Sequence, residues 1–262
     1  MASLLCCVRV PWGKNLTHAR EVFRRFAEIV RFATRWRGRS AAHGHETQQS
    51  DHLDHSGPST MPSDSVIQPP TPFASGSGLA ASPVNLVSGE CSCFSHGAPT
   101  HRKLRLGDFG SVEYGAAFKR YTSTIGRQFC IGPPTPRMRE LYDVVRLAAD
   151  AFIAQVRAGV PAVVPHEAAK RVIAEAGLDR GRVHTSGYGL APGFPPTWGE
   201  PMHLFGGSTY TLQAGMVVTV EPPVFLGEEQ LGARLIDNVL VTNEGAELLS
   251  RFSRDLIVVP LA

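Results

Sequence analysis

Cysteine is scarce in this chain of 262 residues, and its spacing argues against two classes of protein. Five cysteines are an odd number, and too few to cross-link a chain of this length into a secreted disulfide scaffold. They are Cys6, Cys7, Cys91, Cys93 and Cys130. Cys91 and Cys93 have no second pair, so a structural zinc site is not expected. We predict a protein of a reducing compartment, the cytoplasm.

Long apolar runs are also absent. No stretch approaches the roughly 18–20 residues that a membrane-spanning helix needs, so no membrane span is expected. Hydrophobic residues make up 43% of the chain and charged residues 19%. This composition can build one core of roughly 150–250 residues, and it excludes a wholly disordered chain.

Acidic residues are rare in residues 1–40. This segment has nine Lys and Arg against two Asp and Glu, a net charge of +7, which leaves −4 for the rest of the chain. Apolar residues near helical spacing predict one amphipathic helix in this basic arm, from Thr17 to Trp36. The helix either packs on the following domain, which is the simpler interpretation, or serves as a targeting or membrane-surface segment. Nothing in the remainder of the chain indicates nucleic-acid binding.

Residues 41–83 show no apolar periodicity and are rich in His, Gln, Ser, Asp and Pro. Such a segment cannot bury enough surface to offset its chain entropy, so we predict a disordered linker. Histidines and acidic residues gather between His43 and His55, where they could chelate a transition metal. Without secondary structure to hold them, we interpret them as solvated linker.

Residues 84–262 have the pattern of a folded domain with two helices at its centre. Thr135 is suited to an N-cap and Pro136 to the first turn of a helix that ends before Gly159. A second helix is expected over residues 166–176. Strands are expected on both sides of these helices, over 104–112, 118–131, 216–220, 233–242 and 256–259 and near Val183. This order predicts an α+β fold with helices covering one face of a curved sheet.

Four segments carry a resemblance to a known family. They are HTSGYGL (184–190), GMVVTVEPPVF (215–225), ARLIDNVLVTNEGAELLS (233–250) and RDLIVV (254–259). In this order they resemble the creatinase/aminopeptidase family, which has the pita-bread fold and includes methionine aminopeptidase, Xaa-Pro dipeptidase, creatinase and ectoine hydrolase. The resemblance covers residues 84–262.

The family resemblance implies a curved antiparallel sheet with helices on one face, and a homodimer. Members usually open this domain with two helices before the strand that leads to the position of His96. Only one such helix, Thr17–Trp36, is expected here. We therefore expect a pita-bread domain that is incomplete on its N-terminal side.

Metal-dependent members of the family hold two divalent cations with two Asp, one His and two Glu. The matching positions here are Glu113, Thr124, Tyr188, Glu221 and Ile236. Two carboxylates are too few to offset the mutual repulsion of two cations. Asp237 follows Ile236, but successive strand residues point to opposite faces. We predict no dinuclear metal site; one cation held by Glu113, Glu221 and His96 is the alternative.

The residues at these positions are closer to those of the metal-free members of the family. Creatinase and ectoine hydrolase also have a Gly-Tyr turn, as at Tyr188, where the peptidases have Gly-His. His96 falls at the position of creatinase's catalytic histidine, and Glu221 falls on the carboxylate that grips its cationic substrate. These members cleave C–N bonds of small nitrogenous solutes, and the resemblance implies the same here.

Two departures argue against creatine as the substrate. The creatinase glutamate before the matching Arg127 falls on Gly126, and its substrate-binding arginine falls at about Gly199, next to Glu200. Segment 194–200, FPPTWGE, is closer to members that are similar to ectoine hydrolase. The substrate is therefore expected to be another small amino-acid-like or cyclic amidine solute.

We predict that His96 and Glu221 are catalytic. An imidazole moves protons near neutral pH, and a carboxylate on an otherwise apolar strand needs a partner, a metal or a substrate. The predicted substrate-binding residues are Arg127, Tyr188, His184, Glu200 and Glu113. Two alternatives stay open: Glu221 forms a structural ion pair with Arg234, or His184 is a hydrogen-bonding residue at a strand end.

The sequence thus predicts a hydrolase of a C–N bond in a small-molecule substrate, without metal or other cofactor. A metal-dependent Xaa-Pro peptidase, holding one or two divalent cations, is one alternative. The other is a non-catalytic binding protein built on the same fold.

Overall fold

The computed structural model describes residues 79–98, 100–118, 121–190 and 199–259. The basic arm predicted for 1–40 and most of the linker predicted for 41–83 lie outside these residues. The last five linker residues are described, and they belong to strand β1 (Leu79–Ser88). The predicted boundary at residue 84 is therefore at least five residues too late, because pairing with a neighbouring strand, and not apolar periodicity, orders this segment.

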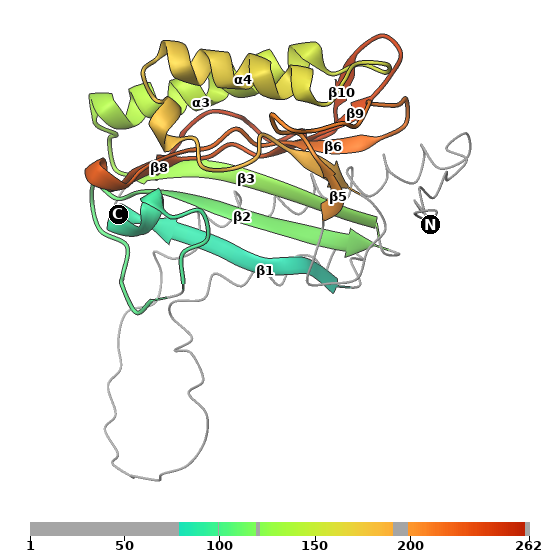
Figure 1. Ribbon diagram of the computed structural model, residues 1–262. Coiled ribbons are helices and arrows are strands. Elements are labelled where there is room, and N and C mark those ends of the chain that lie inside the picture. The colour runs from blue at the N-terminus through green and yellow to red at the C-terminus, as the bar shows by residue number, and fades with distance from the viewer. Residues whose placement is uncertain (1–78, 99, 119–120, 191–198, 260–262) are drawn as a thin grey trace, which may run out of the picture.

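Four strands form the first sheet, in the order β1-β2-β3-β11. Strands β2 (Phe109–Phe118) and β3 (Tyr121–Ile131) pair antiparallel along their whole length, and β11 (Ile257–Val259) adds to β3 in parallel. The long strands β1, β2 and β3 form the lower layer in Figure 1.

Five short strands form the second sheet, in the order β10-β9-β6-β4-β5, and all its neighbours run antiparallel. They are β4 (Tyr188–Leu190), β5 (Gly199–His203), β6 (Val217–Val220), β9 (Asp237–Val241) and β10 (Ala246–Leu248). A separate two-stranded ribbon consists of β7 (Val224–Leu226) and β8 (Leu231–Ala233), which flank the 3-10 turn η5 (Gly227–Glu229).

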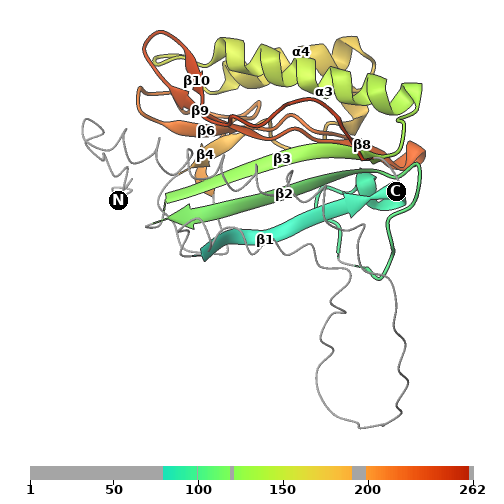
Figure 2. The same cartoon turned by 180° about the vertical axis from the view of Figure 1, so that it is seen from behind.

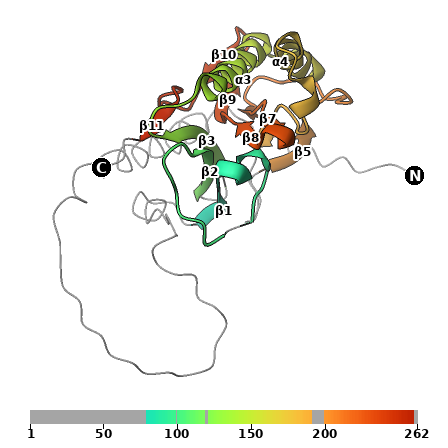
Figure 3. The ribbon, with the colours of Figure 1, turned by 90° about the vertical axis from the view of Figure 1, so that its left-hand side faces the viewer.

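Helices α3 (Pro136–Gln155) and α4 (Val163–Glu175) lie together on one side of the strands, as predicted (Figures 1 and 2). The Thr135 hydroxyl caps α3 by accepting the Met138 N–H at 3.2 Å. Seen from the side in Figure 3, both helices lie opposite β1 and β2. No helix among the described residues is long and apolar enough to span a membrane.

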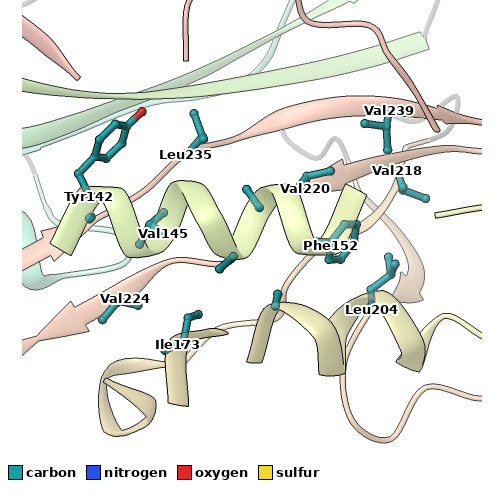
Figure 4. Close-up of a cluster of buried hydrophobic side chains, with 14 of the residues drawn as sticks. Tyr142, Val145, Phe152, Ile173, Leu204, Val218, Val220, Val224, Leu235 and Val239 are labelled. Atoms are coloured by element: carbon teal, nitrogen blue, oxygen red, sulfur yellow. The ribbon is translucent and has the colours of Figure 1, made fainter. Parts of the chain in front are cut away.

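The main core lies between these helices and the strands beneath them (Figure 4). Phe152 of α3 and Ile173 of α4 are completely buried, as are Val218 and Val220 of β6. Burial of such apolar side chains is the dominant stabilising term in folding. The strand bearing Val218 and Val220 is therefore fixed just before the chain reaches Glu221.

Three predicted strands differ from the structure. The strand expected over 233–242 is interrupted between β8 and β9, where the Arg234 N–H donates to the Gln128 side chain at 2.9 Å. The strand expected over 104–112 begins only at Phe109 and not at residue 104, because Asp108 closes a loop by accepting hydrogen bonds from the Arg102 guanidinium at 2.6 and 2.7 Å and from the Arg105 N–H at 2.8 Å. The strand expected near Val183 is absent. Val183 is exposed and follows the 3-10 turn η4 (Asp179–Gly181).

The two sheets meet at Gly126 of β3 and Ile236, just before β9. These residues exchange backbone hydrogen bonds of 3.1 Å in both directions. A short row of backbone contacts therefore crosses from the long-stranded sheet to the short-stranded one, and the candidate site lies along this row.

Candidate active site

Strand register brings the predicted site residues to the junction of the sheets. Glu113 pairs with Gly126, which pairs with Ile236. Val220 pairs with Asp237, so the same register, continued by one residue, sets Glu221 opposite Ile236. The carboxylates of Glu113 and Glu221 are 108 positions apart in the chain. They thus lie along one row of paired residues that crosses the junction of the sheets.

Ile236 fills the centre of this row. A Cβ atom at Gly126 would lie 2.6–2.9 Å from three atoms of the Ile236 side chain, closer than carbon atoms can approach. Gly126 and Ile236, two of the positions at which this sequence lacks a carboxylate of the resembled family, are therefore sterically matched. An acidic side chain at position 126 would require Ile236 to move.

Asp237 points away from the row, as the strand alternation predicted. Its carboxylate binds Arg127 Nη2 at 2.7 Å and Arg254 Nε at 2.8 Å, and it is completely buried.

The other Arg127 donors reach the carbonyl oxygens of Ser253 (2.8 Å), Gly126 (2.8 Å), Ile236 (2.7 Å) and Phe252 (3.2 Å). The prediction that Arg127 binds substrate is therefore wrong, because all five of its N–H donors already have partners.

Glu221 lies at the end of β6 and is only 2% exposed. Its N–H donates to Ser186 O at 2.8 Å, and its Oε2 has no hydrogen-bond partner among the described residues. Burial, and then the negative charge of Glu113, raise the pKa of Glu221 from 4.5 to about 8, although Arg234 and a hydrogen bond from Tyr188 lower it. Its burial thus favours the carboxylic acid form of Glu221 at neutral pH.

His184 lies beside Glu221, with 3.6 Å between His184 Nδ1 and Glu221 Oε1. The same Nδ1 is 2.9 Å from Thr185 O. Because a carbonyl only accepts, we assign the proton to Nδ1, which leaves Nε2 as an acceptor. Burial lowers the pKa of His184, so its ring is neutral at pH 7. A base is therefore placed next to an acid.

His96, in the loop between β1 and β2, lies close to His184. Its ring centroid is 6.3 Å from that of His184, and its side chain is exposed. Its Nδ1 lies 3.3 Å from the Ser95 hydroxyl. The two predicted catalytic residues, His96 and Glu221, therefore both lie next to His184.

Tyr188 is fixed behind Glu221 by a tight turn. Gly187 allows this approach, because a Cβ there would lie 2.3 Å from Thr219 O. The Tyr188 N–H donates to Thr219 Oγ1 at 2.9 Å, and its side chain hydrogen-bonds Glu221. Its ring is also 5.9 Å from that of His203. Tyr188 therefore contacts Glu221, and its role in binding substrate stays a prediction.

Glu113 is paired with Arg234, which donates to it from Nη1; both side chains are buried. This rules out the alternative that Glu221 forms a structural pair with Arg234. Asn85 Nδ2 also donates to Glu113 Oε2, at 3.2 Å. A role for Glu113 in binding substrate stays a prediction.

Glu200 lies on β5 at the edge of the site. Its carboxylate covers Gly189, where a Cβ atom would lie 2.5 Å from Glu200 Oε2. Burial raises its pKa. In the described part of the chain, no hydrogen bond or ion pair joins it to His184 or Glu221, and its role in binding substrate stays a prediction.

A hollow of about 690 Å³ opens at His184. Its basic lining includes Lys170 of α4 and Arg182, and its apolar lining includes Val183 and Phe205. No acidic residue is among those that line it. Positive side chains along a hollow attract an anionic group, so a ligand that reaches His184 through this opening meets a basic surface.

Sequence reasoning missed two features of this site. Arg234 was considered only as a partner of Glu221, although a buried arginine in an apolar segment is itself a signal. His166 of α4, which is buried and lines the hollow, has its Nδ1 2.9 Å from Ser186 Oγ, and burial lowers its pKa. No periodicity could have indicated that contact.

Comparison with known proteins identifies the family. The model of metallopeptidase family M24 matches residues 67–243, more than half of the chain. The chain belongs to metallopeptidase family M24. The pita-bread fold is thereby established, as are the predicted creatinase/aminopeptidase relationship and α+β class.

Several relatives of this M24 chain carry peptidase names. The Xaa-Pro dipeptidase of Pyrococcus furiosus is 29% identical over 176 residues, which are 66% of this chain and 48% of that protein. The crystal structure of dipeptidase PepE from Mycobacterium ulcerans is 32% identical, with a TM-score of 0.67, over 72% of this chain and 50% of that one. A dipeptidase structure from Pyrococcus horikoshii, 22% identical with a TM-score of 0.74 over 94% of this chain and 63% of that one, shares the fold. The chain spans about half the length of the curated relatives it matches.

The described residues of this M24 chain do not fit the metal that the family name implies. Three of the five matching positions hold Thr124, Tyr188 and Ile236, which are not anionic ligands. Glu113, the fourth, is bound by Arg234. No group of three or more His, Cys, Asp or Glu side chains in the described part of the chain is arranged to hold a metal ion.

Proposed function

We propose that this M24 chain is a peptidase-family hydrolase that cleaves a C–N bond of a small amino-acid-like or cyclic amidine solute without a metal ion. One observation carries the proposal: His184 Nδ1 lies 3.6 Å from Oε1 of the buried acid Glu221, and His184 Nε2 makes no hydrogen bond among the described residues. Hydrolysis of an amide or amidine needs a base for the attacking water and an acid for the leaving nitrogen. These two residues supply both.

Water is the nucleophile in this mechanism. His184 Nε2 takes a proton from the water as its oxygen bonds to the electrophilic carbon. Glu221, in its acid form, donates a proton to the nitrogen as the C–N bond breaks. A proton passed through solvent from the imidazolium to the Glu221 carboxylate restores both groups, and His96 is exposed and close enough to His184 to exchange that proton.

The lining of the hollow supports a substrate with a carboxylate. Arg182 Nε binds Asp179 at 3.1 Å, but its two Nη groups contact no acceptor among the described residues. Lys170 Nζ lies 3.3 Å from Glu167, a contact that leaves ammonium hydrogens for a ligand. A carboxylate bound there would hold the rest of an amino-acid-like solute near His184.

The test is a panel of compounds of the ectoine, creatine and Xaa-Pro type, assayed with and without EDTA. We expect one non-peptide solute to be hydrolysed in EDTA. His184→Gln and Glu221→Gln should each lose about 100-fold or more in kcat. His101→Gln, on an exposed loop, is the matched control and should keep full activity.

Two results would replace this function with another. Cleavage of Xaa-Pro compounds alone, lost in EDTA and regained with Mn²⁺, would make the chain a metal-dependent dipeptidase like its named relatives. A solute that binds and is never cleaved would make it a binding protein.

The proposal also includes the homodimer implied by the resemblance, and a cytoplasmic location. Sedimentation of the full chain tests the dimer, since the dimer and the monomer differ twofold in mass.

A further inference from the structure

His166 is a buried, titratable side chain that takes no part in the proposed mechanism. It is the fourth residue of α4 and is 3% exposed. Its Nδ1 lies 2.9 Å from the hydroxyl of Ser186, which is completely buried. Burial, and then the charge of Arg182, lower the pKa of His166, so its ring is neutral at pH 7. His166 therefore acts on Ser186 through a hydrogen bond and not through a charge.

Ser186 joins three separate parts of the fold. Its N–H donates to Leu204 O at 3.1 Å, just after β5, and its carbonyl accepts the Glu221 N–H at 2.8 Å, at the end of β6. Its hydroxyl supplies the third contact, to α4. Residues 184–187 belong to no helix or strand. The position of this turn therefore depends on individual contacts, and Ser186 makes three of them.

The turn over residues 184–188 carries the groups that surround the Glu221 carboxyl group. His184 Nδ1 lies 3.6 Å from Glu221 Oε1, and the Tyr188 side chain hydrogen-bonds the same carboxyl group. Ser186, midway between them in the chain, binds the Glu221 main chain. A misplacement of about 1 Å at a reacting group can reduce a rate about 100-fold. A contact that fixes Ser186 therefore fixes the two proposed reacting groups relative to each other.

Helix α4 gives this contact a rigid support. Ala169 and Ile173, on the same helix, are completely buried in the main core. His166 and Ser186 are 20 positions apart in the chain, so their contact ties a core helix directly to the site. One such hydrogen bond contributes only about 1 kcal/mol to stability. The pair is therefore better explained by the geometry that Ser186 holds than by the stability that it adds.

We propose that His166 is a positioning residue of the site, which fixes Ser186 and through it holds His184 and Tyr188 against Glu221. The inference rests on the proposed function for the reaction alone, because the geometry can be tested without a substrate. His166 also lines the hollow. The competing role is therefore a direct contact with the substrate, and the two roles predict different results.

Amide hydrogen exchange of the full chain tests the positioning role. The Glu221 N–H exchanges only when its hydrogen bond to Ser186 O opens. We expect its exchange rate to rise about tenfold or more in His166→Leu and in Ser186→Ala. His166→Asn is the matched control, because its side-chain amide has the size of leucine and can still hydrogen-bond Ser186, and it should keep the wild-type rate. The Ile131 N–H, which donates to Asp108 O at 2.8 Å in the other sheet, should be unchanged in all three variants.

Action through Ser186 also predicts that the two substitutions are not additive. His166→Leu/Ser186→Ala should exchange the Glu221 amide no faster than the faster of the two single variants. The same variants are then assayed with whichever ectoine-, creatine- or Xaa-Pro-type compound the wild-type chain hydrolyses. In His166→Leu, kcat should fall about tenfold with KM unchanged, and His166→Asn should keep most of the wild-type kcat.

Three results would overturn the inference. An equal rise at the Glu221 and Ile131 amides would show that His166 only stabilises the whole domain. An unchanged Glu221 rate in the variants would show that the contact fixes nothing, and a higher KM with unchanged exchange would make His166 a substrate contact. If His166→Leu does not fold, Ser186→Ala decides between these outcomes. If exchange changes as expected and no compound is hydrolysed, the proposed function alone is contradicted.

Discussion

Two buried arginine–carboxylate pairs lie on neighbouring positions of the same junction, and they are built differently. Arg127 binds Asp237 and four backbone carbonyls, so every donor has an acceptor. Arg234 binds Glu113 and Ser95, but its Nε has no partner among the described residues. The first pair is complete in itself, and the second is not.

This difference in hydrogen bonding distinguishes Arg127, a residue of the structural framework, from Arg234, a residue of the candidate site. A fully satisfied buried network rigidifies the fold, whereas an unsatisfied buried polar group costs free energy and needs another explanation. The buried side-chain atoms without a partner among the described residues include Glu221 Oε2 and Arg234 Nε, and also Arg254 Nη2 beside Asp237.

The largest effect at neutral pH is expected at the satisfied pair. Arg127→Met removes five hydrogen bonds and leaves Asp237 with only Arg254, so the free energy of unfolding should fall by about 3–5 kcal/mol. Urea denaturation measures it. Arg139→Met, an exposed position on α3, should change stability by less than about 0.5 kcal/mol. A smaller loss in Arg127→Met than in Arg234→Met would reverse the assignment of framework and site.

Glu221 should make the stability of the wild-type chain depend on pH. Its pKa is raised on folding, from 4.5 to about 8, so the unfolded chain loses this proton first as pH rises. Its contribution is therefore fully present below pH 4.5 and is lost as pH rises through 8. Glu221→Gln should remove this slope, a difference of about 5 kcal/mol by pH 9. Parallel pH profiles of the two proteins would contradict the buried acid.

The close packing of Ile236 against Gly126 is expected to have a smaller effect on the free energy of unfolding. Gly126→Ala should cost about 2 kcal/mol, because the new methyl group meets the Ile236 side chain. In Ile236→Ala the same change should cost less, giving a coupling of about 1 kcal/mol or more in a double-mutant cycle. If the effects of the two substitutions are additive, Ile236 does not limit the size of the side chain at position 126.

The smallest effect is expected in the hollow. Lys170→Met should raise KM about fivefold for a carboxylate-bearing substrate and leave kcat unchanged, because the contact lies away from the reacting bond. Arg171→Gln, the exposed neighbour on α4, should leave KM unchanged. An equal change in KM for an uncharged substrate would remove the argument for a bound carboxylate.

The sequence predicted the helices better than the strands. Thr135 and Pro136 placed the start of α3 correctly, because capping chemistry is local. The strand predicted from residue 104 begins at Phe109, since the Asp108 loop depends on an arginine six residues away. Short strands such as β8 carry no periodicity long enough to locate, so pairing defines them.

The candidate site could be predicted in part. Glu221 stood out as an acid on an apolar strand, and Asp237 was correctly assigned to the opposite face. Arg127 was misassigned, because its five acceptors come from distant segments and most of them are backbone carbonyls. The contact between His184 and Glu221 joins residues 37 positions apart, and no spacing rule indicates it.

The sequence by itself determined the family, the α+β class and the loss of three metal-ligand positions, because these depend on which residues stand at which places along the chain. Only the tertiary structure decided which arginine meets which acid. Partner choice in a buried network depends on three-dimensional distance and on the desolvation of each group, and neither is written in the order of residues. That choice made Arg127 part of the framework and placed the charge of Arg234 in the site.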